Sequence, residues 1–112
     1  MNNFGISDKS YQLILSAFSK FPEVEKVKVF GSRAKGNYKN GSDIDLAISG
    51  ENCTNKTAMN LNGLLNEEIP VPYHIDVVCY NQLKHAELKE HIDRVGIICY
   101  EQTQPINFAP QK

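Results

Sequence analysis

The sequence lacks the features of membrane and secreted proteins. No apolar run approaches the 20 residues that a membrane-spanning helix requires, and no charged-then-apolar leader opens the chain. The three cysteines are an odd number without a C-x-x-C pair, so we expect no disulfide framework. These absences predict a cytoplasmic protein with no membrane association.

An excess of positive charge is also missing. Lysine and arginine number 12 against 13 acidic residues, which gives a formal net charge of -1. A protein that binds nucleic acid through a broad basic face carries a positive excess, so we do not expect direct nucleic-acid binding. The 112 residues are enough for one domain with a modest core.

The apolar pattern predicts helices alternating with strands. Helices are expected over residues 7–20, 57–68 and 83–94, and strands over 24–30, 44–49, 74–80 and 96–100. The expected apolar face of the second helix consists of Met59, Leu61, Leu64 and Leu65. Such alternation predicts a mixed α/β (α+β) protein with a small mixed sheet flanked by helices.

The end of the sequence differs from the rest. Residues 102–112 contain two prolines and show no apolar periodicity. We expect a folded domain over residues 1–101 and a flexible C-terminal tail over residues 102–112. In the alternative, Ile106 and Phe108 dock this tail on a partner protein.

Two aspartates, Asp43 and Asp45, lie one residue apart in an apolar run. Side chains at i and i+2 point to one face of a strand, so the two carboxylates would repel each other unless a cation neutralised them. Asp76 lies among apolar residues of another expected strand, and the three acids converge if these strands are neighbours. Oxygen ligands favour Mg²⁺ or Mn²⁺, and three carboxylates can hold two ions, as in displacement reactions at phosphorus.

A glycine-serine pair, Gly31 and Ser32, follows the first expected strand. Glycine allows close approach of the backbone to a ligand, and a short helix opening at Ser32 would present free N–H groups to a phosphate. Arg33 and Lys35 add positive charge, although the P-loop spacing is absent. Taken singly, these residues could equally form an ordinary turn with a solvated basic face.

The combined pattern matches a known signature. Gly31-Ser32, ten intervening residues and Asp43-Ile44-Asp45 reproduce the signature of the polymerase-beta-like nucleotidyltransferases. The longer stretch FGSRAKGNYKNGSDIDLAI resembles the minimal nucleotidyltransferase branch, and the resemblance covers residues 7–101. It implies the nucleotidyltransferase fold of that family. Lys35 stands where many relatives have arginine, which keeps the charge.

The resemblance also implies a role for each motif residue. Gly31 and Ser32 would hold the β- and γ-phosphates of a nucleoside triphosphate. Asp43 and Asp45 would bind two Mg²⁺ ions, and Asp76 would be the third ligand and would help to deprotonate the acceptor hydroxyl. The remaining two residues, Arg33 and Lys35, are predicted to be nucleotide-binding, with the partner as an alternative contact of Arg33.

The resemblance further implies a partner. Members of the branch are often encoded beside a helical HEPN protein, and several pairs are toxin–antitoxin modules. The implied activity is transfer of AMP from ATP to a tyrosine of the HEPN toxin, which makes this chain an antitoxin. With no room for an acceptor domain, the acceptor would bind in trans or across a homo- or hetero-oligomer. The alternatives are a non-catalytic module that masks its partner and a nucleotidyltransferase acting on an antibiotic-type small molecule.

Overall fold

The computed structural model describes residues 2–102, so the expected tail lies outside the described residues except for its first residue. The helices are α1 (Asp8–Phe18), α2 (Ser32–Lys35), α3 (Asn55–Gly63) and α4 (Ala86–Val95). The strands are β1 (Lys26–Phe30), β2 (Ile44–Ser49), β3 (Ile75–Cys79) and β4 (Ile97–Glu101). A π-helical turn, η1 (Leu64–Glu68), continues α3, and a 3-10 turn, η2 (Tyr80–Gln82), follows β3. Within the described part of the chain, no helix is long and apolar enough to cross a membrane.

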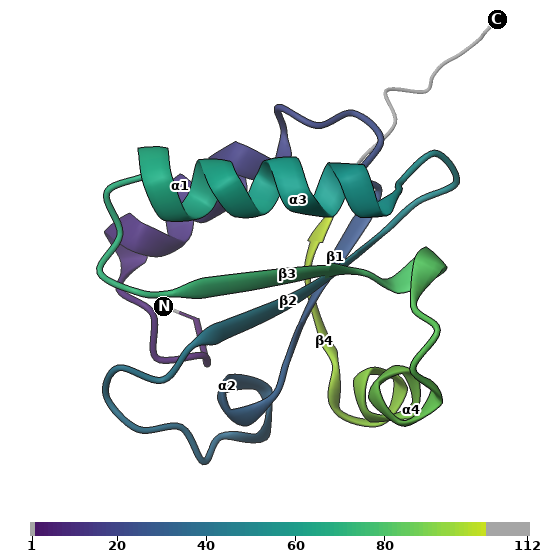
Figure 1. Ribbon diagram of the computed structural model, residues 1–112. Coiled ribbons are helices and arrows are strands. Elements are labelled where there is room, and N and C mark those ends of the chain that lie inside the picture. The colour runs from purple at the N-terminus through teal and green to yellow at the C-terminus, as the bar shows by residue number, and fades with distance from the viewer. Residues whose placement is uncertain (1, 103–112) are drawn as a thin grey trace, which may run out of the picture.

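The four strands form one mixed sheet in the order β3-β2-β1-β4. Strand β1 is antiparallel to both β2 and β4, whereas β2 and β3 are parallel. A parallel pair needs a crossover connection, and α3 with η1 supplies it. Helices α1 and α3 cover one face of the sheet, and α2 and α4 lie on the opposite side (Figure 1). The structure therefore confirms the predicted class, a small mixed sheet flanked by helices.

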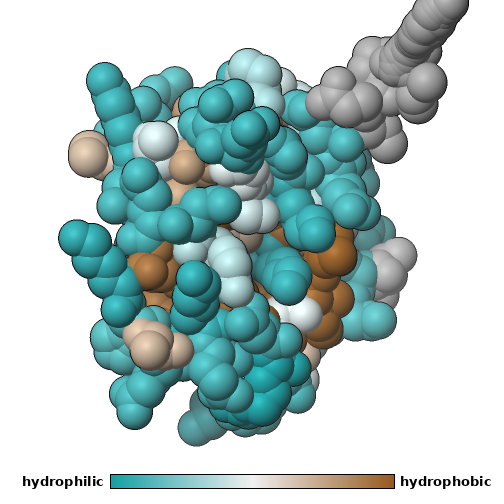
Figure 2. Space-filling model, turned by 90° about the vertical axis from the view of Figure 1, so that its right-hand side faces the viewer, coloured by the Kyte–Doolittle hydropathy of each residue, from teal (hydrophilic) through white to brown (hydrophobic). Residues whose placement is uncertain are grey.

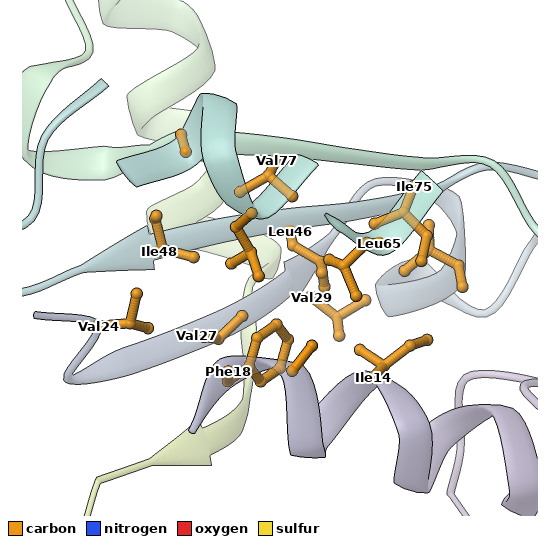
Figure 3. Close-up of a cluster of buried hydrophobic side chains, with 14 of the residues drawn as sticks. Ile14, Phe18, Val24, Val27, Val29, Leu46, Ile48, Leu65, Ile75 and Val77 are labelled. Atoms are coloured by element: carbon orange, nitrogen blue, oxygen red, sulfur yellow. The ribbon is translucent and has the colours of Figure 1, made fainter. Parts of the chain in front are cut away.

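The main core lies between the sheet and the α1–α3 layer (Figure 3). Because successive strand residues point to opposite faces, Val27 and Val29 of β1 are buried there, whereas Lys28 between them points to the other face. Phe18 of α1 is fully buried against this layer. A smaller cluster of Phe30, Ala47 and Ile92 joins the opposite face to α4.

The helix ends follow local capping chemistry. The Ser7 hydroxyl accepts a hydrogen bond from the Ser10 N–H (3.2 Å), as expected for the first residue before α1. Helix α3 begins two residues earlier than predicted, because Thr54 and Thr57 form a reciprocal capping box. Helices α1 and α3 therefore start where a hydroxyl satisfies a free N–H group, whereas α4 is capped by the His85 ring, whose Nδ1 accepts from the Leu88 N–H (3.1 Å).

The predicted apolar face of α3 is wrong in one position. Met59 is 68% exposed, whereas Ala58, Leu61 and Leu65 are buried. The buried residues follow the spacing i, i+3, i+7, which forms one stripe on a helix. Met59 lies one residue, about 100° of helix rotation, away from the start of that stripe.

The surface that includes α4 is mostly hydrophilic, with hydrophobic residues in limited patches (Figure 2). Large exposed hydrophobic residues on the described part of the chain are Met59, Ile97 and Ile98. The last two belong to β4, which is an edge strand of the sheet.

Candidate functional site

The acidic residues meet on the two adjacent parallel strands. The register of β2 and β3 pairs Ile44 with Ile75 and Asp45 with Asp76. Both isoleucines are fully buried, so they fix the strands in the core and leave the two aspartates on the opposite face. Asp45 is half-buried, and Asp76 is exposed. The neighbouring strands that the sequence analysis required are therefore present.

Asp43 lies just before β2 and is exposed. The N–H of the next residue, Ile44, donates to the carbonyl oxygen of His74 (2.9 Å), which ties the entry of β2 to the entry of β3. One residue separates Asp43 from Asp45, and Asp76 is the register partner of Asp45, so all three carboxylates belong to one end of the β2–β3 pair. The negative charges of Asp43 and Asp76 both act on the half-buried Asp45 and raise its pKa.

The pKa of Asp45 is raised above the ordinary value of 3.8. Desolvation by burial is the largest cause, followed by the negative charges of Asp76 and Asp43. His91 and His74 act in the opposite direction and lower this pKa. A bound cation would relieve both the desolvation and the repulsion, because it would supply positive charge where the carboxylates lack it.

The donor chemistry of this cluster fits a hard divalent cation. All three side chains offer oxygen only, which suits Mg²⁺ or Mn²⁺ better than zinc. Across residues 2–102, however, no three acidic, histidine or cysteine side chains converge into a ready-made metal cage. The carboxylates therefore share one edge without enclosing a common point, and the two-metal arrangement stays a prediction.

The glycine turn contacts this cluster directly. Gly31 has a φ of 73° and a ψ of -155°, a conformation open almost only to glycine. A β-carbon at Gly31 would overlap with Oδ2 of Asp45, so the absence of a side chain lets the turn lie against the carboxylate. Ser32, which begins α2, is half-buried beside it. The predicted phosphate turn and the predicted metal ligands are thus in contact.

Arg33 is enclosed by the protein and hydrogen-bonds to backbone carbonyl oxygens. Its side chain is 2% exposed, and Nη1 donates to the carbonyl oxygen of Phe4 (2.8 Å). Nε and Nη2 both donate to the carbonyl oxygen of Ser42 (3.1 and 2.9 Å). The buried guanidinium therefore has its partners within the protein, and its nucleotide-binding role stays a prediction. Lys35, by contrast, is exposed at the end of α2.

Two histidines border the acids. His74 precedes β3, and its position two residues before Asp76 was visible in the sequence. His91 comes from α4, where its ring packs edge-on against Phe30, with the centroids 6.0 Å apart. The sequence does not indicate that His91 lies near the acids, because helical spacing alone does not reveal which strand a helix crosses.

A separate cavity of about 520 Å³ lies between α4 and the strand ends distant from the acids. Lys26, Ser49, Tyr80 and Asp93 are among its lining residues, and none of the three aspartates is. The acidic cluster is therefore an open surface site and not part of this cavity.

Comparisons with known proteins identify the family and agree with the fold. A family model described as polymerase beta, nucleotidyltransferase, matches residues 12–105. A search of curated proteins finds no match. A solved toxin-antitoxin structure with AMP-PNP is similar with a TM-score of 0.68 and 19% identity, covering 82% of this chain and 73% of that chain. The toxin-antitoxin MntA-HepT is similar with a TM-score of 0.64 and 16% identity, covering 86% and 74%. At such identities these two structures establish the fold alone.

Proposed function

Since the chain belongs to the polymerase beta nucleotidyltransferase family, we propose that it transfers AMP from ATP to a hydroxyl group of a partner protein and releases pyrophosphate. The observation that carries this proposal is the contact between the Gly31 turn and Asp45, which is itself the register partner of Asp76. Phosphate-binding backbone and metal-binding carboxylates then lie side by side, as nucleotidyl transfer requires.

Phosphate binding, metal binding and proton acceptance are assigned to different residues of the site. Gly31 and Ser32 bind the β- and γ-phosphates, because the turn has no side chain to block close approach. Asp43, Asp45 and Asp76 would hold Mg²⁺, which when bound neutralises the phosphate charge and acidifies the acceptor hydroxyl. Asp76 is exposed on an edge strand, so an acceptor can approach it from solvent and transfer its proton there.

The proposed acceptor is a tyrosine hydroxyl of a HEPN-family toxin, with this chain as the antitoxin. The similarity of the fold to two toxin-antitoxin structures supports this choice of partner. The open position of the acids supports a large acceptor, because a small molecule would need an enclosing pocket beside them. The helices and strands of residues 2–102 all belong to the sheet and the layers that cover it, so the proposed acceptor binds in trans.

The test uses radiolabelled ATP, Mg²⁺ and a HEPN-family partner that binds the chain. We expect label on the partner with the parent protein and none with Asp43→Asn or Asp45→Asn. Asp8→Asn is the matched control, because it makes the same change at an exposed first-turn position of α1. Unlabelled partner in a stable complex contradicts the proposal. If the Asp43/Asp45 double variant still neutralises the toxin in cells, the protein acts by masking.

A further inference from the structure

The Arg33 side chain joins three segments that are distant in the sequence. All of its hydrogen bonds go to carbonyl oxygens, those of Phe4, Gly5 and Ser42. The guanidinium also stacks between two aromatic rings, 5.0 Å from the centroid of Tyr38 and 5.1 Å from that of Tyr73. A planar cation with several donors suits both kinds of contact.

The contact with Ser42 reaches the site, because Ser42 immediately precedes Asp43. Two nitrogens of one guanidinium converge on the Ser42 carbonyl, which fixes the peptide that leads into the acid. The Ser42 hydroxyl accepts from the Lys39 N–H (2.9 Å), and Ile44 on the other side of Asp43 donates to His74. The Asp43 backbone is therefore held at both neighbouring residues.

We propose that Arg33 is a positioning residue, which holds Asp43 in place for metal binding and does not touch the nucleotide. This inference rests on the proposed function, because it takes Asp43 as a ligand. Residues around a metal site that orient its ligands commonly change metal affinity or activity about 10–100-fold when they are replaced. The observation behind the proposal is the burial of the guanidinium together with its two hydrogen bonds to the Ser42 carbonyl oxygen.

The same geometry makes the N-terminal segment part of the support. Phe4 and Gly5 give Arg33 two of its acceptors, and the Asn2 side chain accepts from the Phe4 N–H (2.9 Å) and donates to the Ile6 carbonyl (2.8 Å). Tyr73, one of the stacking rings, accepts from the Ser7 N–H through its hydroxyl (3.2 Å). Residues 2–7 thus support Arg33 and, through it, the backbone beside Asp43.

The positioning role and a phosphate contact predict different kinetics. Removal of a side chain that binds phosphate raises the KM for ATP. Lysine in its place restores part of the binding, because it keeps the positive charge. Removal of a side chain that positions Asp43 weakens metal binding and lowers kcat. Lysine does not replace such a side chain, because an ammonium cannot reproduce the two hydrogen bonds of the guanidinium to the Ser42 carbonyl or its stacking.

The variants are Arg33→Met, Arg33→Lys and Tyr38→Leu, with Lys56→Met as the control, because it removes one positive charge at an exposed position of α3. Tyr38→Leu removes one stacking face and keeps the guanidinium, so it serves if the Arg33 variants do not fold. The measurements are Mn²⁺ binding by electron paramagnetic resonance, kcat and KM for ATP, and hydrogen exchange of residues 39–44 in the metal-free protein.

We expect both Arg33 variants to bind Mn²⁺ about 10–100-fold more weakly and to exchange faster over residues 39–44. Tyr38→Leu should change in the same direction to a smaller extent, and Lys56→Met should match the parent in both measurements. Parent-like Mn²⁺ binding with a raised KM for ATP in Arg33→Lys and Arg33→Met overturns the positioning role. Failure of the parent itself to bind Mn²⁺ overturns the proposed function instead, whatever the exchange shows.

Discussion

Asp45 and Asp76 are register partners on the parallel strands β2 and β3, so that two acids from segments 31 residues apart occupy neighbouring positions on one face. Such a pair costs stability in the absence of a cation, since two carboxylates share a partly desolvated surface. The fold retains them because the core residues on the other face hold the strands in this register. Activity and stability therefore oppose each other at this position.

The first prediction concerns Asp45→Asn, which should raise the melting temperature at neutral pH without divalent cations. The pKa of Asp45 is higher in the folded protein than the ordinary 3.8, so its stabilising contribution is present at low pH and is lost as the pH rises through the folded pKa. The asparagine amide does not ionise, so the variant does not lose this stability as the pH rises. The gain over the parent should shrink as the pH is lowered towards 3.8, and thermal denaturation over this range measures it.

Addition of Mg²⁺ should make the melting temperature of the parent higher than that of Asp45→Asn. Binding to the folded parent stabilises it by mass action, whereas the variant has lost a ligand. Asp8→Asn serves as the control, since an exposed first-turn acid interacts favourably with its helix and its replacement should lower stability slightly. A lower melting temperature of Asp45→Asn at neutral pH without metal contradicts the repulsion described for this site.

The second prediction compares two glycines with positive φ. Gly36 has a φ of 84° and nothing within 4 Å of an added β-carbon, so Gly36→Ala should cost only the conformational strain, about 1–2 kcal/mol. Gly31→Ala should cost more, because its ψ of -155° lies in a region used almost only by glycine and because the methyl group meets Asp45. Urea denaturation measures both free energies of unfolding.

Activity should separate the two glycine variants further. Gly31→Ala displaces the Asp45 carboxylate and narrows the phosphate turn, so transfer should be lost, whereas Gly36→Ala should keep most of its activity per folded molecule. Equal activity of the two variants would mean that the Gly31 turn does not belong to the site.

The third prediction tests the corrected face of α3. Leu61 is fully buried and Met59 is 68% exposed, although both were expected on the apolar side. Leu61→Ala should lower the free energy of unfolding by about 2–5 kcal/mol through a lost contact and a cavity. Met59→Ala should change it by less than about 0.5 kcal/mol, and chemical denaturation of the pair would contradict this placement if the two changes were similar.

The fourth prediction concerns the cysteine thiols. Burial raises the pKa of Cys53 to about 12, with a further contribution from the neighbouring Cys79, and burial raises that of Cys99 to about 12. Three units above the ordinary value of 9.0 correspond to about a thousandfold less thiolate at neutral pH, and the thiolate is the reactive form. Alkylation by iodoacetamide should therefore be slow until the protein is unfolded in urea. Rapid modification of native Cys53 or Cys99 would refute these shifts.

Local chemistry was enough to predict most elements of the fold. Strand β2 has the predicted bounds, and the first helix lies within the predicted range 7–20, because alternation and helical spacing depend on residues that are near in sequence. The placement of Asp45 beside Asp76 needed one further assumption, that β2 and β3 are neighbours. The parallel register confirms that assumption.

The function of Arg33 could not be read in the same way. A basic residue following a glycine-serine turn indicates a phosphate contact, and nothing in the surrounding letters distinguishes that from a buried support. The partners that decide it are the carbonyl oxygens of Phe4 and Ser42 and the rings of Tyr38 and Tyr73, which the folded chain brings together.

The sequence by itself determined the chemistry available to this protein: a glycine-serine turn, three acids in or beside apolar strands, and a family signature that contains the turn and two of the acids. Only the tertiary structure decided which charges face solvent and which are enclosed, turning Arg33 inward and bringing His91 to the border of the acids. The physical reason is that burial and electrostatic environment depend on contacts between distant segments, whereas periodicity and capping depend on neighbours along the chain.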